Sequence, residues 1–206
     1  MDEAVISRAS SALVCAVRTI FEDYAAKDAL KTAQLNHAIR LMEELRPDPD
    51  RTDLNRLPVC QYLARALDLG ANGPAASVAS AIRDLEPVIT WAQNPRYTLE
   101  NRGAEFLENY GWSGLGLTGS SEMSFGILLL GPNTTYPLTS YESEGIFLVI
   151  GGKPYWKSGN LPWTQVADGD VICRHWNGAE GKRTGQEPML ALYAWMYRPT
   201  GSATPR

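Results

Sequence analysis

The chain has 206 residues, of which 44% are hydrophobic and 20% charged, and its formal net charge is -4. This is enough apolar material for one domain of ordinary size with a small extension. No block of Lys or Arg supplies the basic surface that nucleic-acid binding requires, and no run of about 18 apolar residues is typical of a membrane span. We therefore expect neither a nucleic-acid partner nor a membrane segment.

The N-terminal residues do not fit an export signal. Asp2 and Glu3 stand where a signal peptide carries positive charge, and Arg8 and Arg18 interrupt the apolar stretch that follows. The cysteines are odd in number, far apart and outside any C-x-x-C pattern: Cys15, Cys60 and Cys173. Such cysteines are typical of thiols packed in the core of a protein from a reducing compartment. The sequence thus predicts a bacterial-type cytoplasmic protein.

The first part of the chain carries helical patterns. Apolar residues recur at helical spacing over residues 3–45 and predict one long helix or a broken pair. A second helix is predicted over Pro58–Leu69, with proline in its first turn and Gly70 after its end. A third begins near Ala75 and is disturbed at Pro87. Residues 1–90 therefore form a predicted N-terminal helical segment.

From about residue 91 the apolar runs become short, rich in β-forming residues and separated by Gly and Pro. The strand candidates are Ser124–Leu130, Gly145–Ile150, Pro154–Lys157, Asp170–Arg174 and Met189–Tyr197. Short strands at even spacing favour a small antiparallel barrel or a double-sheet jelly roll over residues 91–198. Residues 199–206 are predicted to be a flexible tail.

Three stretches carry a family resemblance: Tyr136-Pro137 to Gly152, Val166 to Ile172, and Arg183-Thr184 through Glu187-Pro188 to Trp195. In order and spacing they resemble the cupin-type dimethylsulfoniopropionate (DMSP) lyases. The resemblance implies a mainly β fold with α-helices, in which a helical segment precedes a single-domain cupin barrel (a double-stranded β-helix, or jelly roll). It also implies a carbon-sulfur lyase that cleaves DMSP to dimethyl sulfide and acrylate.

The same resemblance implies one divalent metal, such as zinc or iron, inside the barrel. The positions that hold it in the family fall here on Thr139, Tyr141, Gly145, Phe147 and Glu180, and the tyrosine before them is retained as Tyr136. The chain has two histidines, His37 and His175. Because zinc and iron sites need three or four converging donors, the sequence predicts that the metal site is lost and that no cofactor is bound.

Strand alternation supports this loss. Side chains of odd-numbered residues from Thr139 to Phe147 should share the inward face, which turns Glu142 and Glu144 outward. A slip of one residue or a bulge would bring both carboxylates inside and leave a different metal site open. His175 with Glu180 would supply two ligands, which hold a metal weakly.

Tyr136 and Glu180 are the catalytic candidates, although a tyrosine with a pKa near 10 is a poor base unless a cation lowers that pKa. Tyr141 and Phe147 place aromatic rings where the relatives have ligands, and such rings attract sulfonium or quaternary ammonium groups. The other substrate-binding candidates lie near the expected barrel mouth: Trp163, Trp176, His175 and Arg183. Arg183, or else Arg174, would bind a substrate carboxylate.

Two functions remain open. The chain is either a DMSP lyase-like enzyme with weak or no activity, or a metal-free cupin that binds a small cationic metabolite or a protein partner. Its aromatic residues either line a ligand pocket or fill the barrel. The expected ligand is a small molecule, DMSP or another sulfonium or betaine compound, and a homodimer is also left open.

Overall fold

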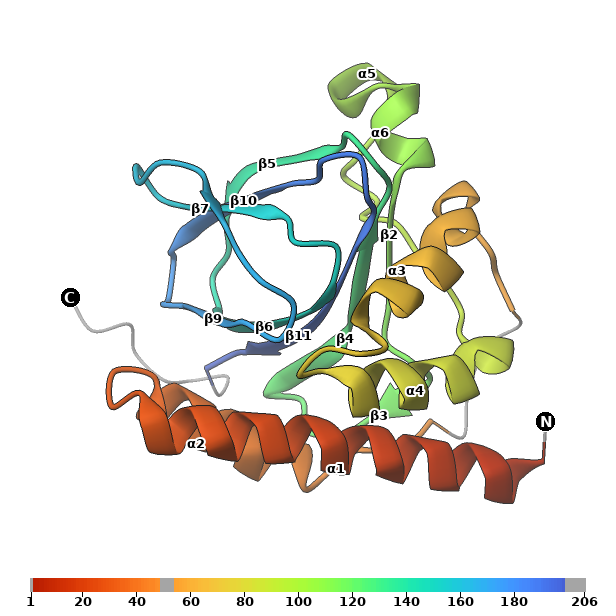
Figure 1. The fold of residues 1–206 in the computed structure, drawn as a ribbon, viewed down its shortest axis with the longest axis vertical. Helices are drawn as coiled ribbons and strands as arrows, with labels where there is room; N and C mark the ends of the chain where they lie inside the picture. The colour runs from red at the N-terminus through yellow and green to blue at the C-terminus, as the bar shows by residue number, and fades with distance from the viewer. Residues whose placement is uncertain (1, 49–53, 199–206) are drawn as a thin grey trace.

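A computed structural model describes residues 2–48 and 54–198, so the predicted tail at 199–206 lies outside the described residues. The helices come first along the chain and are packed on one side of a barrel (Figure 1). The α-helices are α1 (Glu3–Lys27), α2 (Thr32–Met42), α3 (Leu63–Gly70), α4 (Ala76–Leu85), α5 (Leu99–Arg102) and α6 (Ala104–Glu108). Two 3-10 turns are η1 (Pro58–Tyr62) and η2 (Glu86–Val88).

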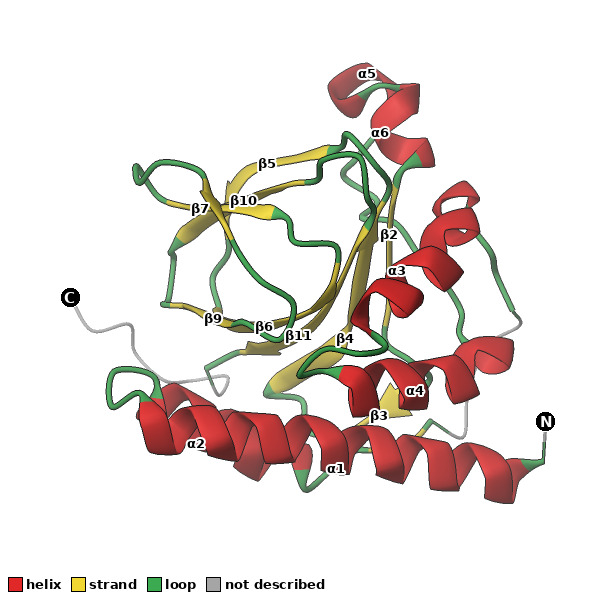
Figure 2. Ribbon diagram, viewed as in Figure 1, coloured by secondary structure: helices red, strands yellow, loops and turns green. Residues whose placement is uncertain are grey.

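The strands form two larger sheets and one short pair, shown in yellow in Figure 2. The five-stranded sheet, in the order β2-β4-β11-β6-β9, contains β2 (Tyr110–Ser113), β4 (Met123–Leu130), β11 (Met189–Met196), β6 (Glu144–Gly151) and β9 (Val171–Arg174). The four-stranded sheet, in the order β5-β10-β7-β8, contains β5 (Thr135–Ser140), β10 (Ala179–Arg183), β7 (Tyr155–Ser158) and β8 (Thr164–Gln165). The short pair joins β1 (Arg46–Pro47) to β3 (Leu117–Thr118).

All pairings are antiparallel, and the two larger sheets face each other around an interior. Non-consecutive strands are neighbours in both sheets, as in a jelly roll. The single-domain cupin barrel after a helical segment, predicted from the sequence, is confirmed by this topology.

The central strands are hydrophobic on both faces because they separate two cores. In β6, Ile146 and Leu148 face the helices, while Phe147 between them faces the barrel interior. The same division places Leu192 of β11 on the helix side and Tyr193 inside. A strand buried on both faces appears in the sequence as a continuous apolar run. This explains why the sequence predicts β4, β6 and β11 close to their observed bounds.

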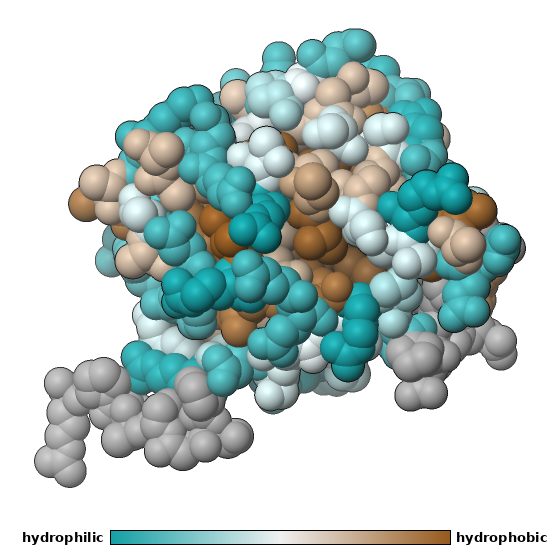
Figure 3. Space-filling model, turned by 90° about the horizontal axis from the view of Figure 1, so that it is seen from below, coloured by the Kyte–Doolittle hydropathy of each residue, from teal (hydrophilic) through white to brown (hydrophobic). Residues whose placement is uncertain are grey.

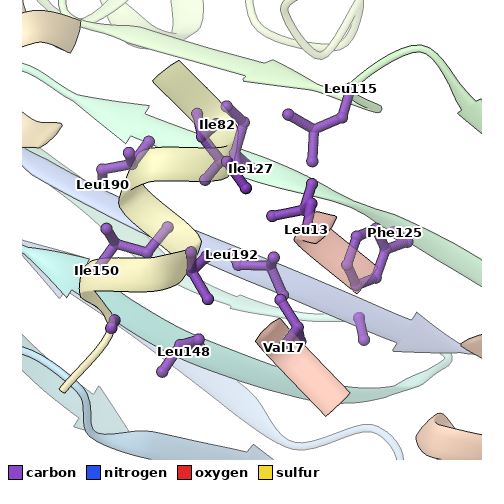
Figure 4. Close-up of a cluster of buried hydrophobic side chains, with 14 of the residues drawn as sticks. Leu13, Val17, Ile82, Leu115, Phe125, Ile127, Leu148, Ile150, Leu190 and Leu192 are labelled. Carbon is purple, nitrogen blue, oxygen red and sulfur yellow. The ribbon is translucent and has the colours of Figure 1, made fainter. Parts of the chain in front are cut away.

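The helix-side core joins the two halves of the chain. Leu13 and Val17 of α1, together with Ile82 of α4, are fully buried and belong to one cluster with side chains of β4, β6 and β11 (Figure 4). The side-chain amide of Gln34 in α2 also donates to the carbonyls of Gly145 and Arg174, at 3.1 and 2.9 Å. The predicted division at residue 90 therefore does not separate two independent cores.

Sequence and structure differ in two connecting regions. The helical pattern over residues 3–45 is a broken pair, because α1 ends at Lys27 and α2 begins at Thr32. Residues 99–108 lie inside the predicted barrel region 91–198, where no helix is expected, and they form α5 and α6. A reciprocal capping box between Thr98 and Asn101 starts α5. Strands β2, β5 and β10 were also not among the strand candidates.

Helix α1 departs from the expectation of no membrane segment. Among the described residues, it is long and apolar enough to cross a membrane by length and composition, with a mean hydropathy of 1.4 over its most apolar window. Its buried side chains, including Leu13, Val17 and Phe21, pack in the helix-side core. Seen from the side of α1 and α2, apolar side chains gather in the middle of a polar face (Figure 3).

The cysteines are free, as the sequence predicted, but their burial differs from the expected core packing. Cys15 on α1 is exposed, and Cys60 and Cys173 are half-buried. Burial raises the pKa of the Cys173 thiol to about 11, so this cysteine is a weak nucleophile at neutral pH. The cytoplasmic location stays a prediction.

Candidate functional site

The inward face of the barrel follows the alternation that the sequence predicted. Phe147 is fully buried inside, whereas Glu142 is exposed and Glu144 lies in an outer groove with His37 and Trp176. A bulge in β5 changes the alternation at one point. Tyr136 pairs with Lys182 and Thr139 pairs with Glu180, so three steps along β5 match two steps along β10. One extra residue in β5 therefore lets both Tyr136 and Thr139 face inward.

A pocket of about 260 Å³ opens into the barrel. The exposure of the lining residues decreases with depth. Tyr197 is 38% exposed, whereas Lys182 is 1% exposed and forms the buried end of the pocket. Most of the wall is aromatic, and the full lining is Asn94, Pro95, Tyr110, Trp112, Ser124, Leu128, Tyr136, Tyr141, Lys182, Tyr193, Trp195 and Tyr197. The volume suits a small metabolite, and it shows that the aromatic side chains do not fill the barrel completely.

Three tyrosine hydroxyls form a hydrogen-bonded chain along this pocket. The hydroxyl of Tyr136 lies 2.7 Å from that of Tyr97 and 2.6 Å from that of Tyr141. Burial raises the pKa values of Tyr136 and Tyr141 well above the ordinary value for tyrosine. Both side chains therefore remain neutral phenols at neutral pH, able to donate hydrogen bonds but not to act as tyrosinate bases.

These tyrosines should make the protein unstable in alkali. Burial raises the pKa of Tyr110, Tyr136, Tyr141 and Tyr193, so above pH about 10 the unfolded chain loses protons that the folded chain retains. Stability should fall by about 1.4 kcal/mol per pH unit for each of them. Burial lowers the pKa of Lys182 and acts in the opposite direction, but only until the unfolded lysine also deprotonates, near pH 10.4.

Urea unfolding at about pH 9 and about pH 11, with tyrosinate absorbance followed in parallel, measures this effect. We expect the ionisation of the buried tyrosines to coincide with unfolding. Ionisation of all nine tyrosines of the chain near pH 10 in a protein that stays folded would contradict the burial described above.

Beside the pocket lies a cluster of three buried charges. The Nζ of Lys182 donates to Oε1 of Glu180 at 2.8 Å, and Nε of Arg174 lies 3.5 Å from the same oxygen. The three side chains are at most 4% exposed. Arg174 is held further by Ser143, whose carbonyl and hydroxyl oxygens accept from its Nη1 and Nη2 at 2.7 and 2.9 Å. We call these residues, Arg174, Glu180 and Lys182, the buried charge cluster.

The ammonium of Lys182 is enclosed by aromatic rings. Its Nζ lies 4.2 Å from the ring centroid of Phe147, 4.7 Å from that of Trp156 and 5.1 Å from that of Tyr136. Such contacts stabilise a buried cation by about 0.5–2 kcal/mol each. Burial nevertheless lowers the pKa of Lys182, while Glu180 raises it. The rings and the carboxylate favour the charged ammonium, whereas its desolvation disfavours it.

The family resemblance implies a divalent metal, and the inward side chains do not fit one. Position 145 is a glycine, and a Cβ there would lie 3.0 Å from Nη2 of Arg174, so the guanidinium takes that space. Among the residues that the structure describes, Glu180 is the buried carboxylate, and it is already paired with Lys182 and Arg174. Within the described ranges, no group of three or more His, Cys, Asp or Glu side chains converges. The side chains around Glu180 are therefore positively charged groups, whereas a divalent metal would need nitrogen, oxygen or sulfur ligands there.

Of the residues singled out in the sequence, Tyr136 and Tyr141 line the pocket. Phe147 and Glu180 are buried next to Lys182, just outside the pocket lining. They support the lysine, and neither forms part of the pocket wall.

The other four candidates lie away from the pocket. Arg183 is exposed and stacks over the rings of Tyr155 and Trp163, at 5.0 and 5.1 Å, on the outer face of the barrel. Trp176 contacts Arg198 in an outer groove, and His175 is exposed in the turn after β9. For Arg183 the reason is strand alternation, because its neighbour Lys182 points inward.

Sequence reasoning missed Lys182, the central residue of the site. The signal was present, since a residue two positions after the inward-facing Glu180 in the same strand must share its face. The same alternation turns Arg183, the candidate for binding a substrate carboxylate, to the outer face of the barrel. Tyr97 had no comparable signal, because it lies outside the strands and reaches Tyr136 through a turn at Asn94.

Fold and site together define a single-domain cupin with an aromatic pocket and a buried charge cluster. The family model described as dimethylsulfoniopropionate lyase matches residues 30–191. The chain therefore belongs to the DMSP lyase family. No curated protein matches its sequence significantly.

Two solved structures share the whole architecture, helices included. A chain from the crystal structures of the DMSP lyases RdDddP and RnDddQII superposes with a TM-score of 0.75 at 20% identity, covering 95% of this chain and 96% of that one. The DMSP lyase DddQ from Ruegeria pomeroyi DSS-3 gives a TM-score of 0.67 at 20% identity, over 90% and 94% of the two chains. At this identity the likeness shows a common fold.

Proposed function

We propose that this DMSP lyase-like cupin holds DMSP, or a related sulfonium or betaine compound, in the aromatic pocket without a divalent metal, and that it releases dimethyl sulfide weakly or not at all. The observation that carries the proposal is a pocket of about 260 Å³ with a largely aromatic wall in a chain of this family. The relatives named above are DMSP lyases.

Aromatic rings suit the cationic end of such a ligand. Tyr141 stacks on Trp195 at 5.4 Å and Tyr193 stacks on the same indole at 4.6 Å, so three rings are held in fixed orientation at the pocket wall. Sulfonium and quaternary ammonium groups are attracted to ring faces by about 0.5–2 kcal/mol per ring. Because the rings are packed before any ligand arrives, little side-chain entropy is lost on binding.

Cleavage of DMSP needs a base, and this pocket offers a poor one. The base must remove the proton next to the carboxylate while the carbon-sulfur electron pair leaves with dimethyl sulfide, which forms the double bond of acrylate. Tyr136 has a raised pKa and stays protonated. The carboxylate of Glu180 is engaged by Lys182 and lies outside the pocket lining. Both features support binding with weak turnover or none.

The test combines thermal shift and headspace gas analysis on chelator-treated protein. We expect DMSP to raise the melting temperature without any metal, because a ligand that prefers the folded state stabilises it, and no dimethyl sulfide to form above the buffer rate. The variant Tyr141→Leu should lose the shift, and Tyr155→Leu, on the outer face, should keep it. Bound metal at one ion per chain with gas release would contradict the proposal.

A pocket that binds none of these compounds is the competing interpretation. It predicts no shift in melting temperature with DMSP or with a panel of sulfonium and betaine compounds. That result would leave a protein partner, the second alternative from the sequence, as the better account of this chain.

A further inference from the structure

The interior of the barrel carries an unbalanced positive charge. Among the described residues, the buried charged side chains are Arg174, Glu180 and Lys182. Arg174 and Lys182 share this one carboxylate, so with both cations charged the cluster has one net positive charge. A net charge in the interior is costly, and a ligand with one negative charge would neutralise it. A ligand that is only a cation would instead add a second uncompensated charge.

Hydrogen-bond donors line the same pocket. Lys182 carries three N–H donors, of which one goes to Glu180, and the lysine lines the inner end of the pocket. The indole N–H of Trp195, another lining residue, is buried without a hydrogen-bond partner in the described part of the chain. A buried donor without a partner is destabilising until an acceptor reaches it.

The rest of the pocket wall has different chemistry. Tyr197 is exposed, Tyr141 and Trp112 are half-buried, and all three side chains are aromatic and uncharged. The pocket therefore combines one buried lysine with a largely aromatic wall.

We propose that Lys182 forms a carboxylate-binding site at the buried end of the pocket, so that the ligand is a small zwitterion with its carboxylate at Lys182 and its sulfonium or ammonium group against the aromatic rings of the wall. This inference rests on the proposed function and adds the orientation of the ligand. Lys182 acts as a binding residue, and a carboxylate of the ligand beside it would favour its charged ammonium form.

Three compounds of nearly the same shape separate the contributions, measured by isothermal titration calorimetry. DMSP has both charges, its methyl ester keeps only the sulfonium, and 4-methylpentanoate keeps only the carboxylate. We expect the ester to bind the native protein roughly 10–100-fold more weakly than DMSP, the usual loss when a charge-assisted hydrogen bond is removed. The carboxylate isostere should retain measurable binding.

Variants then assign the effect to one residue. Lys182→Met should bring the affinity for DMSP down to that for the ester, whereas Lys157→Met, on the paired strand β7, should change nothing. If Lys182→Met fails to fold, the double variant with Glu180→Gln removes both charges of the pair and serves instead. Folding of each variant is checked by circular dichroism.

The outcomes separate this inference from the proposed function. Equal binding of DMSP and its ester, or full DMSP affinity in Lys182→Met, would overturn the carboxylate site and leave DMSP binding intact. Binding of 4-methylpentanoate without binding of DMSP would keep the carboxylate site and overturn the proposed ligand. Binding of none of the three would overturn both.

Discussion

Replacing Glu180 with glutamine should lower the free energy of unfolding by about 3–5 kcal/mol, the usual loss when one partner of a buried ion pair is removed. The carboxylate is the only charged acceptor for Lys182 and Arg174 among the buried side chains of the described residues. Glutamine keeps the size and one acceptor oxygen, so the change isolates charge from packing. Urea unfolding measures the loss when the curves of both proteins are fitted with one common dependence of unfolding free energy on urea concentration (the m-value).

A second variant distinguishes an unpaired charge from a general packing defect. The double variant Glu180→Gln/Lys182→Met removes one charge of each sign and should be more stable than Glu180→Gln alone. Glu144→Gln, on the outward face of β6, is the matched control and should stay within about 0.5 kcal/mol of the native protein. If Glu180→Gln is as stable as the native protein, or if the double variant is less stable than Glu180→Gln, the stability of the cluster does not depend on its charge balance.

Truncating Leu13 to alanine should cost about 2–5 kcal/mol and should destabilise the barrel as well as the helices. Leu13 lies in α1 and is fully buried against strands of the five-stranded sheet (Figure 4). The cavity left by its side chain would lie between the helices and β4, so both halves of the chain lose contacts. We therefore expect one cooperative transition, shifted to lower denaturant.

The measurement needs a probe for each half. Far-ultraviolet circular dichroism follows the helices, and tryptophan fluorescence reports on the barrel, where Trp156 is buried. Leu30→Ala is the matched control, because Leu30 is 91% exposed and should change stability by less than about 0.5 kcal/mol. Two separate transitions, with the barrel unaffected by Leu13→Ala, would mean that the helical segment is an independent unit.

Local patterns were sufficient where burial is regular. Strands β4, β6 and β11 are apolar on both faces, and turns rich in Gly bound them, so the sequence predicted them within a residue or two. Helices α5 and α6 are short and mostly exposed, so their residues have no apolar pattern at helical spacing that would predict them. The loop that carries Tyr97 belongs to the site because the hydroxyl of Tyr97 bonds to that of Tyr136, 39 residues away in the chain, and no local pattern predicts this contact.

The sequence by itself determined the cupin fold and the family, because residue types and their spacing are read directly from the chain. The replacement of the family's histidine and glutamate positions stays a prediction. The sequence also determined, through strand alternation, that Phe147 points inward and Glu142 outward. The tertiary structure alone decided that Arg174, Glu180 and Lys182 meet in one buried cluster beside the aromatic pocket. These side chains are buried because the two larger sheets close around them. The sheets are built from strands far apart in the sequence, so no local sequence pattern predicts this burial.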